Sequence, residues 1–377
     1  MFDRNSLLLV SRVLNITGDW FYYFVITLLV FQLDSAPIFL SLLTASYILP
    51  GIIFPKLFLS LNNKRGQNFL LVIYDSFRAL MIFLMIFTNN VWVLLILVFM
   101  EQILSIGSSM SFGSLVASLS DKKIASFNGN LNAWTSLTKL LIIPTFLMLS
   151  DLVQYDGLLL INCVLTIFSV ILTRISRVDA SSEKVNSSIT VENEALTVTT
   201  KSIIAIFSIV ALVRIFYDSY TLIYLKYIQA DTTIGYSITT FIIGLSTIIC
   251  SLLSKKIIEG LSRKVKFITT IILLLTLISM LGVLLLQNVI IFYLVVFITT
   301  FIISFYELYM LYFIQTRYGD NVQSIYSIQI FMYNLVALCS TLISGMIISS
   351  VGVRFYIFLL VIVYMISYIF ILTRRWK

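Results

Sequence analysis

The chain has 377 residues, of which 60% are hydrophobic and 11% are charged. Soluble domains carry about 25% charged residues, so this composition excludes a soluble globular protein. The formal net charge of +8 does not indicate a nucleic-acid partner, because the basic residues lie in short loops between apolar segments and no segment could form a soluble nucleic-acid-binding domain.

Twelve apolar segments follow one another along the chain, each long enough to cross a bilayer. A transmembrane helix needs about 20 mostly apolar residues to cross roughly 30 Å of hydrocarbon. The first segment is too long for a signal peptide, so we expect it to remain in the mature protein. The sequence predicts an all-α membrane protein with spans at 7–31, 38–61, 68–88, 90–118, 127–150, 153–175, 201–227, 232–254, 266–287, 289–316, 322–348 and 351–373.

Lysine and arginine are concentrated in every second loop. The opposite loops contain Arg354 and the acidic Asp34, Asp151, Asp156 and Asp231. Basic loops stay in the cytoplasm, so we expect a multi-pass plasma-membrane protein, of bacterial type, with both termini cytoplasmic. The basic loops hold Arg4, Lys64, Arg65, Lys122, Lys123, Arg174, Arg177, Lys184, Lys201, Lys255, Lys256, Arg263, Lys264, Lys266, Arg317, Arg374, Arg375 and Lys377.

A polar segment at residues 176–200 divides the spans into six and six. It has mixed charge and no long apolar run, which is typical of a flexible linker. We therefore predict a six-helix bundle at 1–175, a cytoplasmic linker at 176–200, and a second six-helix bundle at 201–377. Two such bundles related by an axis along the membrane normal are a known transporter architecture.

The two halves carry similar charges inside their spans. Arg12 and Asp19 in the first span correspond to Arg214 and Asp218 in the seventh, and Glu101 in the fourth corresponds to Glu307 in the tenth. These counterparts are separated by 199 to 206 residues along the chain. The nearly constant offset predicts two pseudo-symmetric halves.

Four of the charged residues fall near the middle of their spans: Asp19, Glu101, Lys139 and Arg214. A charge at this depth costs about 2.5–3.5 kcal/mol on insertion scales, so such residues face the bundle interior and pair or line a wet cavity. Transporters of this plan bind substrate there. We expect these four residues to form a central charged site.

Asp19 lies beside aromatic residues that include Trp20 and Tyr23. A carboxylate with an aromatic lining suits a cationic, amphipathic ligand. The alternative is that Asp19 only neutralises Arg12 on its own helix or Lys139 across the cavity.

Glu101 is the strongest candidate for proton coupling, because burial favours the neutral form of a carboxylate and so permits proton exchange. The alternative is an ion pair with Lys139. The chain has no histidine, so any proton relay must use carboxylates, with tyrosine and water as possible helpers. Glu307, nearer the cytoplasm, is either a second proton site or a gate residue. Arg214 and Asp218 are four residues apart and can pair locally.

Short motifs match one transporter family. The loop at 59–68 contains Lys64 and Gly66 of the pattern Gly-x-Leu-x-Asp-Arg-x-Gly-Arg-Arg, and the loop after the eighth span contains Glu259 and Arg263 at the acidic and basic positions. With the six-plus-six layout, these motifs resemble the major facilitator superfamily. That resemblance implies alternating access and a monomer.

The first half resembles macrolide-efflux-type exporters of that superfamily. Gly18-Asp19, Leu49-Pro50 and Asp75-x-x-Arg78 carry this resemblance. It implies proton-driven drug efflux. Together with the loop motifs, it implies a conformational gating role for Asp75, Arg78, Lys64, Gly66, Glu259 and Arg263. For Asp75 and Arg78, ligand contact is the alternative. Asn63 replaces the acid of the loop motif, which predicts a weaker latch.

No nucleotide-binding glycine loop and no His/Cys cluster occur, so we predict neither an enzyme nor a cofactor nor a metal. The leading hypothesis is an antiporter that exports a cationic or zwitterionic amphipathic molecule in exchange for protons. The alternatives are an importer or a lipid/peptide exporter for an anionic substrate held by Lys139 and Arg214, and a transport-degenerate immunity or sensory partner.

Overall fold

A computed structural model describes residues 4–54, 57–58, 66–117, 155–176, 198–261, 265–318 and 322–373, together with single positions between 127 and 145. All regular structure in these ranges is α-helical. The helices of the first unit are α1 (Arg4–Leu33), α2 (Pro37–Ile53), α4 (Gln67–Met85), α5 (Val91–Ala117) and α7 (Tyr155–Ser176). Those of the second unit are α8 (Val198–Tyr227), α9 (Thr232–Leu261), α10 (Val265–Leu285), α11 (Val289–Tyr318), α12 (Val322–Val351) and α13 (Val353–Thr373).

Each predicted span corresponds to helix. Eleven spans coincide with the eleven helices above, and the described positions of the remaining one, at 127–150, are helical as well. Within the described residues, nine helices are long and apolar enough to cross a membrane, and α2 is a shorter apolar helix. The predicted all-α membrane fold is therefore confirmed.

Helix α2 is shorter than the predicted span at 38–61. It ends at Ile53, and Phe54 forms a bend before helical Leu57 and Phe58. Pro55 follows the bend in the sequence and has no backbone N–H to continue the hydrogen-bond ladder, which accounts for the interruption.

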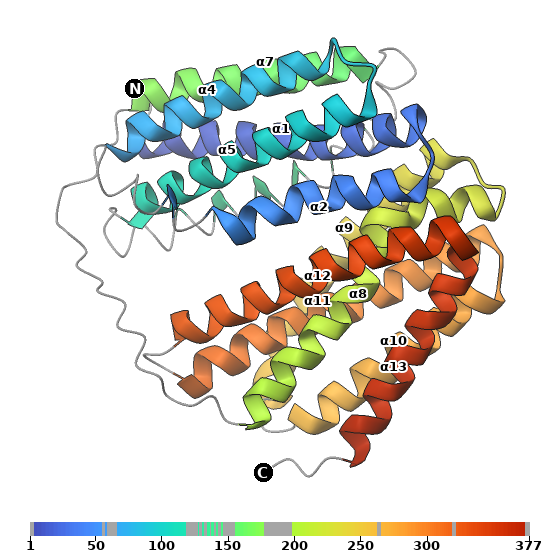
Figure 1. The fold of residues 1–377 in the computed structure, drawn as a ribbon. Helices are drawn as coiled ribbons and strands as arrows, with labels where there is room; N and C mark the ends of the chain where they lie inside the picture. The colour runs from blue at the N-terminus through green and yellow to red at the C-terminus, as the bar shows by residue number, and fades with distance from the viewer. Residues whose placement is uncertain are drawn as a thin grey trace. The chain divides into compact units, whose positions relative to one another are not determined.

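The chain divides into two compact units, residues 1–187 and residues 188–377. In Figure 1 the first unit runs from blue to green and the second from green to red. Helix α7 continues to Ser176 and α8 begins at Val198, so both ends of the predicted linker are helical. Residues 177–197 lie outside the described part of the chain.

Helix α4 shows how these units differ from a soluble fold. Its exposed face carries Phe69, Phe77 and Phe83, whereas its buried face carries Asp75 and Arg78. An apolar outer surface is what lipid requires, and ionisable groups inside the bundle are the arrangement that a membrane protein favours. The helix therefore directs its charges toward α5 and α7, against which it packs.

Close contact between α1 and α7 depends on one glycine. A Cβ atom at Gly18 would collide with the amide oxygen of Asn162, and it would lie 3.7 Å from the hydroxyl of Thr166. A larger residue would require the Asn162 side chain to move, and small residues are favoured where membrane helices pack this closely. The contact brings Asp19, the next residue, to the interior of the unit.

Candidate functional site

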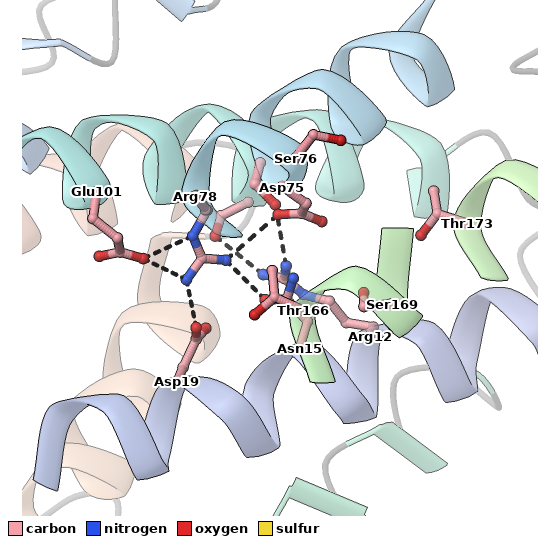
Figure 2. Close-up of polar contacts among 12 residues, drawn as sticks. Arg12, Asn15, Asp19, Asp75, Ser76, Arg78, Glu101, Thr166, Ser169 and Thr173 are labelled. Atoms are coloured by element: carbon pink, nitrogen blue, oxygen red, sulfur yellow. Dashed lines mark hydrogen bonds and ion pairs between the residues drawn. The ribbon is translucent and has the colours of Figure 1, made fainter. Parts of the chain in front are cut away.

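The first unit contains a buried ionic cluster centred on Arg78 of α4. Its Nε donates to Oε1 of Glu101 at 2.8 Å, and its Nη2 lies 2.7 Å from the same oxygen. Nη2 also pairs with Oδ1 of Asp19. Nη1 donates to Oδ1 of Asn15 at 2.8 Å and lies 3.5 Å from Oδ1 of Asp75. We call Asn15, Asp19, Asp75, Arg78 and Glu101 the Arg78 cluster (Figure 2).

One guanidinium thus joins carboxylates from three helices. Asp19 comes from α1, Asp75 from α4 itself, and Glu101 from α5. Arginine suits this position because its planar group offers five N–H donors in a fixed geometry. A lysine would provide a single point charge and could not hold the same partners in the same directions.

The members of the cluster differ in accessibility. The side chain of Asp19 is 36% exposed, whereas those of Arg78 and Glu101 are 2% and 0% exposed. Asp19 is therefore the carboxylate that a ligand can reach, and Glu101 is sequestered behind Arg78. The second oxygen of Glu101 accepts a hydrogen bond of 3.0 Å from Gln102, which completes its partners.

The partner of Asp19 differs from the one considered from the sequence. Asp19 pairs with Arg78, whereas Arg12 donates to the hydroxyls of Ser108 and Ser109 at 3.4 and 3.1 Å. Asp19 thus forms its ion pair with Arg78, while Arg12 interacts with Asp19 at longer range. Arg12 lies seven residues earlier, about 10 Å along the helix axis, while Arg78 reaches Asp19 from the side.

Arg12 also lies over the ring of Phe112, with its guanidinium carbon 4.7 Å from the ring centroid. This is a cation–π geometry. Asp75 is in electrostatic range of Arg12 as well as Arg78.

Lys139, the other predicted partner of Asp19 and Glu101, is outside the described residues. For Glu101 the structure supplies Arg78 instead, and this partnership was missed because Asp75 and Arg78 were interpreted as gating residues. Asn15 was missed altogether. A buried asparagine four residues before Asp19, on the same face of α1, was the available signal.

Aromatic residues that follow Asp19 in the sequence pack between α1 and α2. Tyr23 packs against Tyr47 of α2 with ring centroids 4.9 Å apart, and Tyr22 meets the same ring edge-on at 6.3 Å. Trp20 and Tyr23 are each partly buried. An accessible carboxylate thus has aromatic rings on the same helix.

The second unit contains a more exposed cluster around Arg214 of α8. Nη1 of Arg214 lies 2.6 Å from Oε1 of Glu307 on α11, and Nε lies 3.7 Å from Oδ2 of Asp218. The predicted local pair with Asp218 is therefore present, and Glu307 is the closer partner. The side chains of Arg214, Glu307 and Asp218 are 44%, 31% and 39% exposed.

The predicted gating residues of the loops are described only in part. Gly66 is an exposed residue that directly precedes α4. Lys64 and Arg263 are outside the described residues, and Glu259 lies in α9 without a described side chain. Their gating roles stay predictions. Among the described residues, no group of three or more His, Cys, Asp or Glu side chains could hold a metal ion.

An all-helical fold of two membrane units, each with an arginine bound to carboxylates in its interior, is the architecture of a secondary transporter. The family model described as Major Facilitator Superfamily matches residues 8–336. The chain therefore belongs to the Major Facilitator Superfamily, whose members are transporters and not enzymes. No curated protein matches the sequence.

Solved structures share this fold at low sequence identity. The nucleoside transporter NupG is 12% identical, with a TM-score of 0.80 over 99% of this chain and 100% of that one. A bacterial homologue of the human lysosomal transporter Spinster, in an inward-facing and occupied conformation, is 12% identical, with a TM-score of 0.71 over 99% of this chain and 98% of that one. Identities this low establish the shared fold alone.

Proposed function

We propose that the chain is a proton antiporter that exports an amphipathic, cationic or zwitterionic small molecule by alternating access. The observation that supports this most is the position of Arg78, which binds an accessible carboxylate and a fully buried one through the same guanidinium. Substrate would bind at Asp19, and the coupling proton would bind at Glu101. The Arg78 cluster would link the two events.

Glu101 and Asp19 would compete for Arg78, and this competition would couple proton binding to substrate release. When Glu101 is ionised it holds Arg78, which leaves Asp19 free to attract a cationic substrate. When Glu101 takes up a proton it no longer needs a counterion, so Arg78 neutralises Asp19 and the substrate is released. Proton and substrate therefore exclude each other, as antiport requires.

Aromatic residues would complete the substrate site. A cation within about 6 Å of an aromatic face is attracted by the ring, and the effect grows when the site is desolvated. Trp20 and Tyr23 lie on the same helix as Asp19 and would provide this contact. Glu307, already bound to Arg214, would act as a second exchangeable ion pair in the other unit.

The remaining features of this proposal concern orientation and gating. The charge pattern of the loops supports a plasma-membrane location with both termini in the cytoplasm. The resemblance to macrolide-efflux-type exporters supports export and proton coupling. Asp75, Arg78, Lys64, Gly66, Glu259 and Arg263 would then control the change between open states.

Transport in inside-out vesicles tests the proposal. Vesicles from a host that lacks its own exporters would be assayed with a panel of cationic dyes and drugs, with and without a pH gradient. We expect gradient-dependent uptake that is lost in Glu101→Gln and reduced at least tenfold in Asp19→Asn. Asp156→Asn is the matched control, because Asp156 is an exposed carboxylate of the same unit. Normal transport by both Glu101→Gln and Asp19→Asn would show the assignment to be wrong.

A second candidate is transport of an anionic substrate, as an importer or a lipid/peptide exporter. The observation that favours it is the exposure of Arg214, at 44%, in contrast to the 2% of Arg78. Arg214 could exchange Glu307 for an anionic group of a ligand. Competition by anions that is lost in Arg214→Gln would favour this candidate over cation export.

A further inference from the structure

A buried row of hydroxyl and amide side chains lies between α1 and α7. On α1, Ser11, Asn15 and Gly18 are spaced by four and three residues, so they share one helix face. All three are buried. The facing residues of α7 are also polar and at most 2% exposed. We call the following set the α1–α7 seam: Ser11, Asn15, Gly18, Asn162, Thr166, Ser169, Thr173 and Ser176.

Hydrogen bonds cross between the two helices at the outer end of the seam, where Oγ of Ser11 donates to the backbone carbonyl oxygen of Ser169 at 2.9 Å. Oγ of Ser11 lies 2.5 Å from Oγ1 of Thr173 and 3.0 Å from Oγ of Ser169. Further along, Oγ1 of Thr166 donates to the backbone carbonyl oxygen of Asn162 at 3.0 Å and lies 3.4 Å from Oδ1 of Asn162, which in turn rests against Gly18. The two helices are antiparallel in this register. The seam therefore runs from the first turns of α1 and the last turns of α7 to the middle of both.

The inner end of the seam belongs to the Arg78 cluster. Asn15 accepts a hydrogen bond of 2.8 Å from Nη1 of Arg78, and the same nitrogen lies 3.5 Å from Asp75. The thiol of Cys163, the residue after Asn162, donates to the carbonyl oxygen of Ala79 at 3.5 Å, so this turn of α7 lies against α4. Figure 2 shows Thr166 close to this cluster, with Ser169 and Thr173 following along α7.

Two amide groups in the seam point to a bound solvent molecule. Nδ2 of Asn15 and Nδ2 of Asn162 are buried and have no hydrogen-bond partner among the described residues, and each side chain is 1% exposed. A buried donor without a partner costs about 1–3 kcal/mol. A water molecule accepts two hydrogen bonds and donates two, so it can satisfy both amides and still donate to a carboxylate.

We propose that the α1–α7 seam is a proton path, with bound water at Asn15 and Asn162 connecting its hydroxyls to Asp75 of the Arg78 cluster. This inference rests on the proposed proton coupling. Each hydroxyl would rotate away from the backbone carbonyl that it bonds, receive a proton on its oxygen and pass its own proton to the next hydroxyl or bound water, so no seam side chain gains a net charge. The outer end lies at the helix ends whose adjoining loops carry the predicted cytoplasmic charges, so the path would exchange protons with that side of the membrane.

The charged groups near the inner end come from three helices. Arg12 and Asp19 lie on α1, Asp75 and Arg78 on α4, and Glu101 on α5. The described seam residues of α7 contribute only hydroxyl and amide groups. Protons therefore have carboxylate acceptors at one end of the seam and neutral relay groups along the rest of it, as intramembrane proton relays need.

Proton uptake by the purified full-length protein tests the proposal without any substrate. An acid pulse in a stopped-flow instrument, followed with the pH dye pyranine, measures both the number of protons bound and the rate. The double variant Asp19→Asn/Glu101→Gln identifies the protons that bind to the cluster. We expect Ser11→Ala/Thr173→Val to bind the same number of cluster protons as wild type, but at least tenfold more slowly.

A matched control removes a similar pair from the other unit. The hydroxyls of Ser246 on α9 and Thr300 on α11 lie 2.6 Å apart and are buried. Ser246→Ala/Thr300→Val should leave the rate unchanged. Asn162→Leu is a second test variant, because it removes a water-binding amide and leaves every hydroxyl in place. Thermal unfolding verifies that each variant is folded.

The outcomes separate this inference from the function on which it rests. If the cluster binds protons but both seam variants do so at the wild-type rate, the seam only packs the helices and the proposal is overturned, while proton coupling stands. If Asp19→Asn/Glu101→Gln binds as many protons as wild type, neither Asp19 nor Glu101 is a proton site, and the proposed coupling and the path that would supply it both fail.

Discussion

The two units use the same charges in different ways. In the first unit, Arg78 binds Asp19 on α1 and Glu101 on α5. In the second unit, Arg214 binds Asp218 on α8 and Glu307 on α11. The arginine of the first unit comes from a neighbouring helix and is buried, whereas Arg214 shares its helix with Asp218 and is 44% exposed. Arg78 therefore connects three helices, α1, α4 and α5, whereas Arg214 connects two, α8 and α11.

Burial determines what each arginine contributes. Removing one member of a buried ion pair leaves an uncompensated charge and costs several kcal/mol, but exposed pairs contribute about 0–1 kcal/mol. The Arg78 cluster should therefore hold the first unit together, and the Arg214 cluster should be available for exchange. Paired substitutions in the two units test this difference between the two clusters.

The largest difference is expected between Arg78→Gln and Arg214→Gln. The first should lower the free energy of unfolding by about 3–5 kcal/mol, since it leaves Asp75 and Glu101 buried without their counterion. The second should lower it by less than about 1 kcal/mol. Arg78→Lys should not restore stability, because an ammonium group cannot reproduce the fork of contacts. Thermal unfolding in detergent measures all three, and equal losses for both glutamine variants would contradict the comparison.

The next largest effect concerns helix contact. Gly18→Ala should destabilise the first unit by about 1–3 kcal/mol, because its Cβ would collide with Asn162. Gly244→Ala in α9 is the matched control, since no atom lies within 4 Å of the added Cβ. It should be neutral or slightly stabilising, as alanine favours helix. Unfolding transitions of the two variants test this, and a stable Gly18→Ala protein would show that α1 and α7 can separate.

Salt should distinguish the two clusters. Charges in contact with water are screened as ionic strength rises, whereas buried pairs are screened much less. The stability lost in Glu307→Gln should therefore shrink between 0.05 and 1 M salt, roughly one order of magnitude in ionic strength. The loss in Glu101→Gln should stay constant. A loss in Glu101→Gln that shrinks with salt would mean that its environment is wet.

The smallest expected effects concern tyrosine hydroxyls. The hydroxyl of Tyr220 donates to the carbonyl oxygen of Thr341 at 2.7 Å and accepts from Ser344 at 2.6 Å, joining α8 to α12. Tyr220→Phe should cost about 1 kcal/mol. Tyr22→Phe should be neutral or slightly stabilising, because the Tyr22 hydroxyl is buried with no hydrogen-bond partner in the described structure. The difference in melting temperature tests whether hydroxyls stabilise the second unit more than the first.

The membrane class, the positions of the spans and the two sets of intramembrane charges can be predicted from the sequence. These follow from local properties, since the length of an apolar run and the cost of a charge in lipid do not depend on neighbouring helices. It also located Asp19, Glu101, Arg214 and Glu307. Each of these four residues lies in one of the two clusters.

Only the tertiary structure decided which charges are partners. The motif match predicts a gating role for Asp75 and Arg78, yet in the structure Arg78 binds Asp19 and Glu101 from two other helices. Lipid-facing and core-facing positions are both apolar in a membrane helix, so the sequence pattern does not show which neighbour a given face meets. That choice depends on helix rotation and on close contacts such as Gly18 against Asn162, which bring residues far apart in the chain within hydrogen-bonding distance.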